Sequence, residues 1–406
     1  MIKNVKLLPV LLLSGAIALT GCSSTAETAQ EATEYVNDTA STQESTAADT
    51  SVEESSTVIL QDLVEPLLEI KDDAVSTDAA TEAFSIDRDT QVEVVFFGDS
   101  QIANGRDDGT DIPTLTSLRV PNTIMYNLAI GGTTATLEKT TSSIDPATMV
   151  STSFVGLTYC LAGTADRNTT LANYPKVLNT MNSIEPGEVD YYIIEYGAND
   201  FINGVPLDNS MYDADQLHSV YNAMCVGIET LKSISPNAKF IIMTPFYGIY
   251  VDGNGAYIGD SYIVSNGIGT LSDYAKKIQN VAEDKGAIIF DDMFKSKCDL
   301  YLDTANEYLM DNLHLSLKGR QIFARLLAHQ LNFEEHNEPY AYLEGDFIKI
   351  AEFDPNEDFR YNEAWMQEFY PESWEKYVRG EFPLAQPSEW ALEQAGLSSS
   401  TEASSN

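Results

Sequence analysis

The feature that most constrains the fold of this chain is the alternation of short apolar runs with amphipathic helical patterns through its middle. The runs are nearly continuous in hydrophobic character and lie at residues 92–97, 124–128, 191–196, 240–243 and 287–290. Runs of this length and character are typical of parallel strands whose sheet is covered on both faces. They therefore predict a sheet in the interior of a layered domain.

Helical patterns follow these runs along the chain. Apolar residues recur at helical spacing over residues 217–231 and 271–282, and Gly286 is placed to end the second of these helices. A third helix is expected from Ser316, a candidate N-cap, to about residue 331. Alternating strands and helices predict βαβ units and a doubly wound α/β sheet, in which ligands bind beyond the carboxyl ends of the strands.

Four short blocks lie at predicted strand ends or beside a predicted helix start. They are Gly98-Asp99-Ser100, the segment 127–133 (NLAIGGT), Gly197-Ala198-Asn199-Asp200, and Asp311-Asn312-Leu313-His314. Since the carboxyl ends of parallel strands share one edge of a sheet, these blocks are expected to converge there.

The blocks hold the side chains that nucleophilic catalysis requires. A serine hydroxyl is a weak nucleophile that needs a base within hydrogen-bond reach, and the base needs a carboxylate that fixes its tautomer. Ser100, His314 and Asp311 supply these three groups. Donors near Gly132 and Asn199 could stabilise the negative charge that develops on the attacked carbonyl oxygen.

Together the four blocks resemble those of the SGNH (GDSL) hydrolase family, over about residues 91–332 and not in the flanks. The resemblance implies a flavodoxin-like three-layer α/β/α fold with a mainly parallel five-stranded sheet. It implies an activity among the esterases, lipases, thioesterases and carbohydrate deacetylases, with no metal and no organic cofactor.

The resemblance also implies a role for each matching residue. Ser100 is expected to be the nucleophile and to donate its backbone N–H to the oxyanion. Gly132 would donate a second backbone N–H, and Asn199 its side-chain amide. His314 would act as general base and then acid, oriented by Asp311, with an acid limb near pH 6.5 if its pKa is unperturbed.

The chain departs from the family pattern at two places. Ala129 stands where the family usually has glycine, and Leu315 stands where proline often follows the histidine. Because Gly131 and Gly132 are adjacent, the second backbone donor could be either; we choose Gly132. The pattern G-x-S-x-G does not occur, which excludes the α/β-hydrolase nucleophile elbow.

The net charge of the chain argues against a nucleic-acid partner. It has 406 residues, with 62 acidic and 23 basic side chains and a net charge of −39. Residues 23–90 hold 17 of the acids against 2 bases, and residues 333–406 hold 17 against 4. A surface this negative repels phosphate backbones, so we expect no nucleic-acid partner.

The N-terminal segment predicts a secretion signal and a membrane anchor. Lys3 and Lys6 precede a short apolar run that ends in Leu19-Thr20-Gly21-Cys22, which resembles the bacterial lipoprotein box. The resemblance implies a signal peptide over residues 1–21 and a lipid anchor at Cys22, followed by an acidic tether over 22–90. The protein is then expected at the cell membrane, lipid-anchored on its extracellular face, or at the outer membrane of a Gram-negative cell. Residues 58–70 could dock as a short helix or be part of the linker.

Three further regions leave alternatives open. Five aromatic residues over 246–262 could line the site or form a packed hairpin. The C-terminal extension, 333–406, has 13 aromatic residues between 340 and 390, and we favour packing on the main domain over a lid or a glycan-binding surface. At most one disulfide can form among Cys160, Cys225 and Cys298, and the pair is not defined.

The sequence thus predicts an extracytoplasmic lipid-anchored serine esterase that hydrolyses acetyl or other short O-acyl esters on carbohydrate. A lysophospholipase or other lipid esterase, or an acyltransferase, on the same triad is the alternative. A non-catalytic solute-binding lipoprotein is a third possibility, which the presence of all three catalytic side chains disfavours.

Overall fold

The structure is a computed structural model that describes residues 91–397, except 142, 209–215, 295–296, 339, 344–346, 356–359 and 383–384. The predicted signal peptide, the anchor residue Cys22, the acidic tether and the segment 58–70 lie outside the described residues.

The centre of the molecule is a five-stranded, all-parallel sheet of order β2-β1-β3-β4-β7. Its strands are β1 (Val92–Gly98), β2 (Thr123–Asn127), β3 (Tyr191–Glu195), β4 (Lys239–Met243) and β7 (Ile288–Phe290). All five predicted strands are confirmed, with ends that differ by one residue in places. Every residue of β3 is buried, as expected for a central strand that is covered on both faces.

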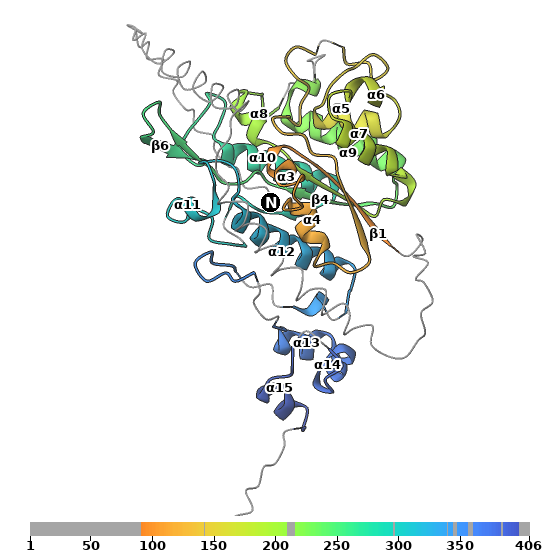
Figure 1. Cartoon of the computed structure of the whole chain (residues 1–406), viewed down its shortest axis with the longest axis vertical. Helices are drawn as coiled ribbons and strands as arrows, with labels where there is room; N and C mark the ends of the chain where they lie inside the picture. The colour runs from red at the N-terminus through yellow and green to blue at the C-terminus, as the bar shows by residue number, and fades with distance from the viewer. Residues whose placement is uncertain are drawn as a thin grey trace, which may run out of the picture.

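Helices cover the sheet on both faces and confirm the three-layer α/β/α fold (Figure 1). On one side, α4 (Ile112–Ser117) packs against α12 (Leu317–Glu334) and β2. On the other side, α9 (Val220–Ile234) packs against α5 (Phe154–Leu161) and α10 (Leu271–Lys285). The remaining elements of the main body are α3 (Ser100–Ala103), α6 (Arg167–Thr170), α7 (Pro175–Ser183), α8 (Ala198–Ile202), α11 (Ala305–Tyr308), η2 (Pro186–Glu188) and η3 (Gln216–His218).

The predicted helix ends are largely confirmed. The Ser316 hydroxyl accepts the Gly319 N–H at 3.2 Å and begins α12. Gly286 ends α10 with a left-handed φ of 64°, which costs glycine no Cβ strain. The pattern over 217–231 was expected to be one helix, but Leu217 lies in the short 3₁₀ helix η3, and α9 begins only at Val220.

The aromatic segment after β4 forms a small hairpin. Phe246 and Tyr247 are buried in the main core, and the chain then forms the antiparallel strands β5 (Ile249–Val251) and β6 (Tyr257–Asp260). The packed-hairpin alternative is therefore correct for the backbone. Tyr257 and Tyr262 nevertheless stay exposed.

The C-terminal extension divides into two parts. Ile350 and Phe353 are buried in the main core, whereas η4 (Tyr340–Tyr342), α13 (Glu363–Phe369), α14 (Pro371–Val378) and α15 (Glu389–Gln394) enclose a second, smaller cluster of buried side chains. Figure 1 shows α13, α14 and α15 grouped away from α3 and α8. The aromatic residues thus mainly build a core of their own, and this core also meets the main domain, where the Trp365 ring lies 6.1 Å from the Phe333 ring of α12.

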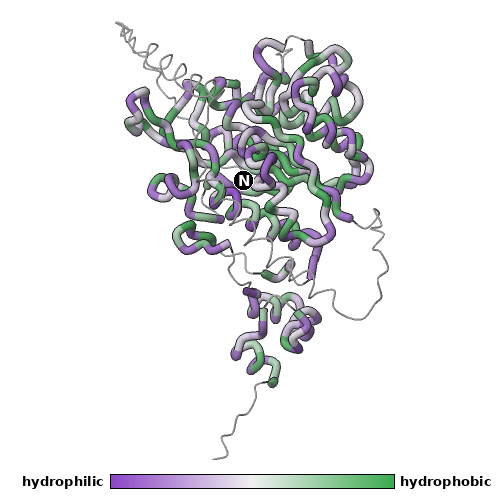
Figure 2. The backbone as a smooth tube through the Cα atoms, viewed as in Figure 1, coloured by the Kyte–Doolittle hydropathy of each residue, from purple (hydrophilic) through white to green (hydrophobic). Residues whose placement is uncertain are grey.

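The most hydrophobic part of the backbone runs through the central strands, where the main core lies (Figure 2).

Cys160, Cys225 and Cys298 are all free thiols. Among the described helices, none combines the length and apolar character needed to cross a bilayer.

Candidate active site

The site lies where the sheet changes the direction of its connections. Strands β1 and β3 are neighbours, while β2 lies on the outer side of β1, so the chain leaves the two strands toward opposite faces. Such a switch point is the usual ligand position in an open α/β sheet. Ser100 is the first residue of α3, directly after β1, and Asn199 lies in α8, directly after β3.

A glycine is required just before the nucleophile block. A Cβ at Gly98 would lie 2.6 Å from Ile102 Cγ1, which is closer than packed atoms approach. The missing side chain therefore allows α3 to turn tightly onto the end of β1, with Ser100 at its start.

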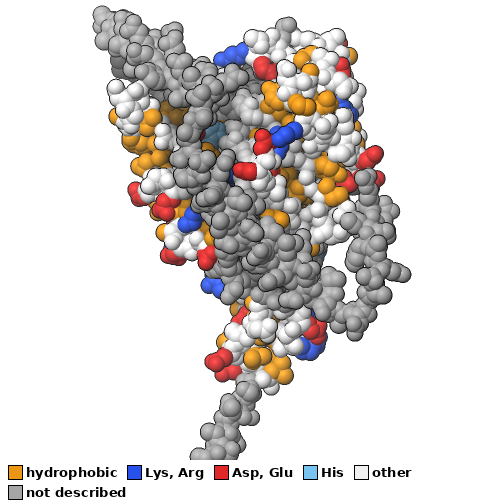
Figure 3. Space-filling view, viewed as in Figure 1, with side chains coloured by type: hydrophobic (Ala, Val, Ile, Leu, Met, Phe, Trp, Pro, Cys, Tyr) orange, Lys and Arg blue, Asp and Glu red, His pale blue; other side chains and the backbone are white. Residues whose placement is uncertain are grey.

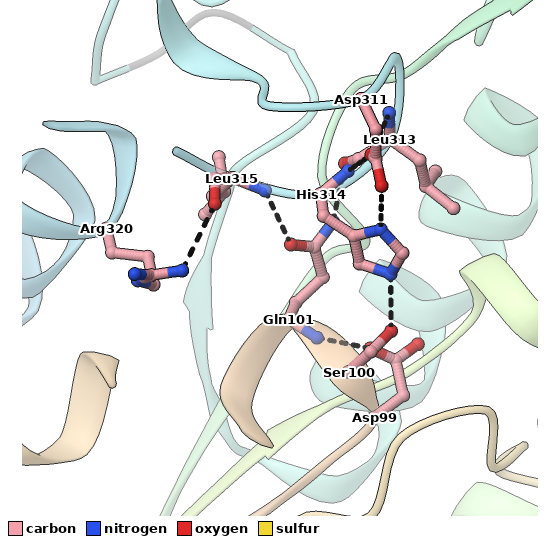
Figure 4. A network of polar contacts seen from close by, with 8 residues as sticks. All are labelled: Asp99, Ser100, Gln101, Asp311, Leu313, His314, Leu315 and Arg320. Carbon is pink, nitrogen blue, oxygen red and sulfur yellow. Dashed lines mark hydrogen bonds and ion pairs between the residues drawn. The ribbon is translucent and has the colours of Figure 1, made fainter. Parts of the chain in front are cut away.

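The structure brings the three predicted catalytic side chains together although 214 positions separate Ser100 from His314 (Figure 4). The Ser100 hydroxyl lies 2.9 Å from His314 Nε2, and His314 Nδ1 lies 2.8 Å from Asp311 Oδ2. With the proton on Nδ1 donated to Asp311, Nε2 is free to accept the Ser100 proton. This arrangement can activate a serine hydroxyl for attack on an ester carbonyl.

The loop that contains Asp311 and His314 folds back on itself. Asp311 Oδ1 accepts the backbone N–H of His314 at 2.7 Å and that of Leu313 at 3.2 Å. Asn312 takes a left-handed φ of 47°, a conformation that asparagine tolerates better than most residues. The spacing of three residues thus lets one carboxylate hold both the ring and the backbone of the histidine.

The electrostatics suit a general base. Partial burial opposes ionisation of Asp311, but the hydrogen bonds from the ring and backbone of His314 outweigh it and lower the pKa of Asp311 to about 2. The hydrogen bond to Asp311 raises the pKa of His314 above its ordinary value, against the opposing effect of burial. Asp311 therefore stays charged wherever His314 titrates.

Two residues that the sequence did not reveal hold this loop in place. The Gln101 side chain donates to the Leu313 carbonyl at 2.8 Å and accepts the Leu315 N–H at 3.1 Å. Arg320 on α12 donates to the Leu315 carbonyl at 3.3 Å (Figure 4). Neither residue belongs to a motif, so no local signal could have identified it.

The Gln101 contact also explains a departure from the family pattern. A proline after the histidine has no N–H, whereas Leu315 donates its N–H to Gln101. The other departure, Ala129, is accommodated because its φ is not positive; its N–H donates to Asn127 Oδ1 at 3.1 Å.

Two glycines lie beside the nucleophile. A Cβ on Gly131 would lie 3.6 Å from the Ser100 Cβ, so the backbone here passes close to the serine. Gly132 has a left-handed φ of 77° and is exposed. Within the described residues, the backbone N–H groups of Ser100, Gly131 and Gly132 donate to no backbone carbonyl.

The side chain of Asn199 points to the same region but is fully engaged. Its amide donates to Asp99 Oδ2 at 2.9 Å and to the Thr133 carbonyl at 3.0 Å. These contacts link the third sequence block to the first and to the second.

Asp99 and Asp200 support the backbone around the site. Asp99 Oδ1 accepts the Gln101 N–H at 2.9 Å and caps α3. Asp200 accepts the N–H groups of Ala135 and Thr136 and the Thr136 hydroxyl. Burial raises the pKa of each of these two carboxyls to about 6.

The β5–β6 hairpin borders the site. The N–H of Ile249 on β5 donates to the Asn312 carbonyl at 2.8 Å, and Asn266 beyond β6 donates to the Phe201 carbonyl on α8 at 2.7 Å. Its exposed apolar side chains include Tyr257, Ile258 and Ile263, and the space-filling view shows hydrophobic atoms gathered on this side of the molecule (Figure 3).

Within the described residues, no group of three His, Cys, Asp or Glu side chains is arranged to hold a metal ion. His218 lies in η3 with its Nε2 3.2 Å from the Glu138 carbonyl, and His329 lies within α12.

The main body of the chain matches a known protein family. The model of the family described as GDSL-like lipase/acylhydrolase matches residues 94–327. No curated protein matches the chain.

Several solved structures are similar. A possible lipase from Chitinophaga pinensis DSM 2588 is 18% identical, with 61% of this chain and 99% of that chain covered and a TM-score of 0.41. The acetyl xylan esterase AlAXEase is 16% identical (57% and 96% covered, TM-score 0.35), and Est24, a carbohydrate acetylesterase from Sinorhizobium meliloti, is 13% identical (59% and 98%, TM-score 0.35).

The family model spans more than half of the chain and includes every block of the site. The chain belongs to the GDSL-like lipase/acylhydrolase family and is an SGNH-type serine hydrolase.

Proposed function

We propose that this protein is an extracytoplasmic, lipid-anchored esterase that removes acetyl or other short O-acyl groups from carbohydrate by way of an acyl-enzyme. The observation that carries the proposal is the unbroken hydrogen-bonded series Ser100–His314–Asp311. It supports catalysis over the alternative of a solute-binding lipoprotein, because a binding site has no need of an aligned base.

In the first half of the reaction Ser100 Oγ attacks the ester carbonyl carbon while His314 Nε2 takes the hydroxyl proton. The C–O bond to the alcohol then breaks, and His314 returns the proton to the departing alcohol oxygen. In the second half His314 removes a proton from water, which attacks the acyl carbon. The carboxylic acid leaves, and Ser100 recovers its proton from His314.

The oxyanion is proposed to form between the backbone N–H groups of Ser100 and Gly132 and the amide of Asn199. The amide must give up one of its present bonds to donate there. The bond to the neutral Thr133 carbonyl is the one to exchange, because a bond to the Asp99 carboxylate is charge-assisted and stronger. The retained bond to Asp99 then holds the Asn199 amide in place while its other N–H turns to the oxyanion.

The substrate class is supported by the exposed tyrosine of the β5–β6 hairpin. Tyr257 is 47% exposed, and its hairpin contacts the loop of Asp311 and His314. An aromatic ring at the rim of a site can stack on the apolar face of a sugar. The exposed Ile258 on the same strand and the exposed Ile263 just beyond it would instead favour a lipid ester, so the substrate panel below includes both substrate classes.

The anchor is proposed from Cys22 at the end of the signal-like segment. Cys22→Ala should move the protein from the membrane fraction to the medium or a soluble compartment. Continued recovery with membranes would contradict the anchor.

The activity is tested with a fluorophosphonate probe, p-nitrophenyl esters of increasing chain length, acetylated xylan, acetylated peptidoglycan and a lysophospholipid. We expect labelling that is lost in Ser100→Ala, and the highest kcat/KM on acetyl esters. Tyr257→Ala should raise KM for acetylated xylan but not for p-nitrophenyl acetate, whereas the exposed Tyr174→Ala serves as the control. Preference for the lysophospholipid would favour the lipid-esterase alternative, and an unlabelled, inactive wild type would contradict the proposal.

A further inference from the structure

A buried acid that the proposed mechanism does not use lies directly behind the site. Glu195 is the last residue of β3 and is paired in register with Gly98 of β1, so it lies beside the start of the nucleophile block. Its side chain is 0% exposed. Within the described residues, no hydrogen-bond donor reaches either of its carboxyl oxygens.

The charged groups that face Glu195 are also acids. From the β1 side it faces Asp99, and from the end of β7 it faces Asp292, which is itself buried and receives no donor on either oxygen in the part of the chain described. The cations of this region lie beyond these acids: His314 acts on Asp99 and Lys297 acts on Asp292.

Two carboxyl groups in contact inside a protein cannot both ionise, because the repulsion and the lost hydration are not compensated. Asp99 has the donors that stabilise a charge, namely the Gln101 N–H and the Asn199 amide. Glu195 has no such partner within the described residues, and the Asp99 backbone N–H beside it lowers its pKa less than burial and the neighbouring acids raise it, so the shared proton belongs on Glu195. Burial, followed by the charge of Asp99, raises the pKa of Glu195 well above its ordinary value, which agrees with this assignment.

We propose that Glu195 is a positioning residue: as a neutral carboxylic acid it donates a hydrogen bond to Asp99 and so fixes the carboxylate that holds the Asn199 amide. This inference rests on the proposed role of Asn199 at the oxyanion. It also leaves only one negative charge, that of Asp99, in contact with the donors of the oxyanion site. A second charge there would oppose the oxyanion that the site must stabilise.

The test compares two substitutions of similar size. Glu195→Gln keeps a neutral group that can donate to Asp99, whereas Glu195→Met removes the donor. We expect kcat of the Gln variant within about 3-fold of wild type, and kcat of the Met variant lower by about 10–100-fold with KM little changed, as for a misplaced catalytic group. Restoration of kcat by Gln but not by Met distinguishes positioning from simple filling of space.

A spectroscopic measurement is independent of activity. Asp292 is a second buried carboxyl group without a donor, so its own band must be removed first. In the Asp292→Asn background at neutral pH, the infrared spectrum should contain the C=O stretch of a protonated carboxyl group that disappears when Glu195→Gln is added. Absence of that band from Asp292→Asn, or its persistence in the double variant, would overturn the inference, as would equal kcat in the Gln and Met variants. If Glu195→Met does not fold, the infrared comparison decides alone. If the fluorophosphonate probe does not label Ser100 of the wild type, the proposed function is refuted, whereas the infrared band is unaffected.

Discussion

The two sides of the candidate site use carboxylates in opposite ways. On the side of β1 and β3, Asp200 is 0% exposed and burial raises its pKa to about 6. On the side of the histidine loop, the Asp311 side chain is 57% exposed and its pKa is lowered to about 2. The buried carboxylate holds backbone N–H groups in place, whereas the exposed one stays charged and orients a ring.

This difference shows what holds the catalytic side chains of each side in position. The nucleophile side is fixed by the sheet, since Ser100 and Asn199 directly follow neighbouring strands. The histidine side is a loop between the short α11 and α12, and it depends on contacts from elsewhere, chiefly Gln101. Substitutions in the loop should therefore alter catalysis more than stability.

The largest effect is expected for Asp311→Asn. The variant keeps the shape of the carboxylate but loses its charge, so kcat should fall by about 10²–10⁴-fold, as when a triad histidine loses its orienting carboxylate. The acid limb of kcat/KM should also move to lower pH, because the main cause of the raised His314 pKa is removed. Initial rates against pH measure both effects, and the exposed Asp303→Asn is the control. An unchanged kcat would place the orienting function elsewhere.

The second largest effect is expected on the side of the site that follows β1 and β3. Asn199→Ala should lower kcat by about 10²–10³-fold, the usual loss for one oxyanion donor. The variant should still be labelled at Ser100, more slowly, because the triad is intact. Asn182→Ala, at an exposed position of α7, should have wild-type kinetics. A kcat of Asn199→Ala equal to that of the control would remove Asn199 from the oxyanion site.

A smaller effect is expected at the junction of the two sides. Gln101→Leu removes both bonds to the histidine loop and leaves the buried N–H of Leu315 without its acceptor. We expect the free energy of unfolding to fall by about 1–3 kcal/mol and kcat to fall by about 10-fold. Chemical denaturation and steady-state kinetics give the two values, with Gln330→Leu on α12 as the control. Unchanged kcat with reduced stability would show that the loop keeps its geometry without Gln101.

The smallest effect is a shift in pH dependence. His314 must be neutral to act as a base, so kcat/KM should fall as pH decreases through its pKa. Because the hydrogen bond to Asp311 raises that pKa, the midpoint of the acid limb should lie above 6.5 in the wild type. A midpoint below 6.5 would show that burial outweighs Asp311 in the free enzyme.

Much of the fold could be predicted because buried parallel strands leave continuous apolar runs and helices leave a 3.6-residue period. The triad candidates could be predicted because each lies in a short block at an element end. Gln101 and Glu195 could not, since their partners are distant in sequence and a single polar residue has no period. The second core of the C-terminal extension was missed because aromatic content does not reveal which surface the rings pack against.

The central claim, that Ser100 is the nucleophile of this hydrolase, is tested most directly by trapping the acyl-enzyme. Wild-type protein is mixed with p-nitrophenyl acetate, quenched in acid within the first turnover, digested and analysed by mass spectrometry. We predict one acetyl group on the peptide that contains Ser100, and none in Ser100→Ala. An acetyl group on another residue, or turnover that persists in Ser100→Ala, would contradict the account.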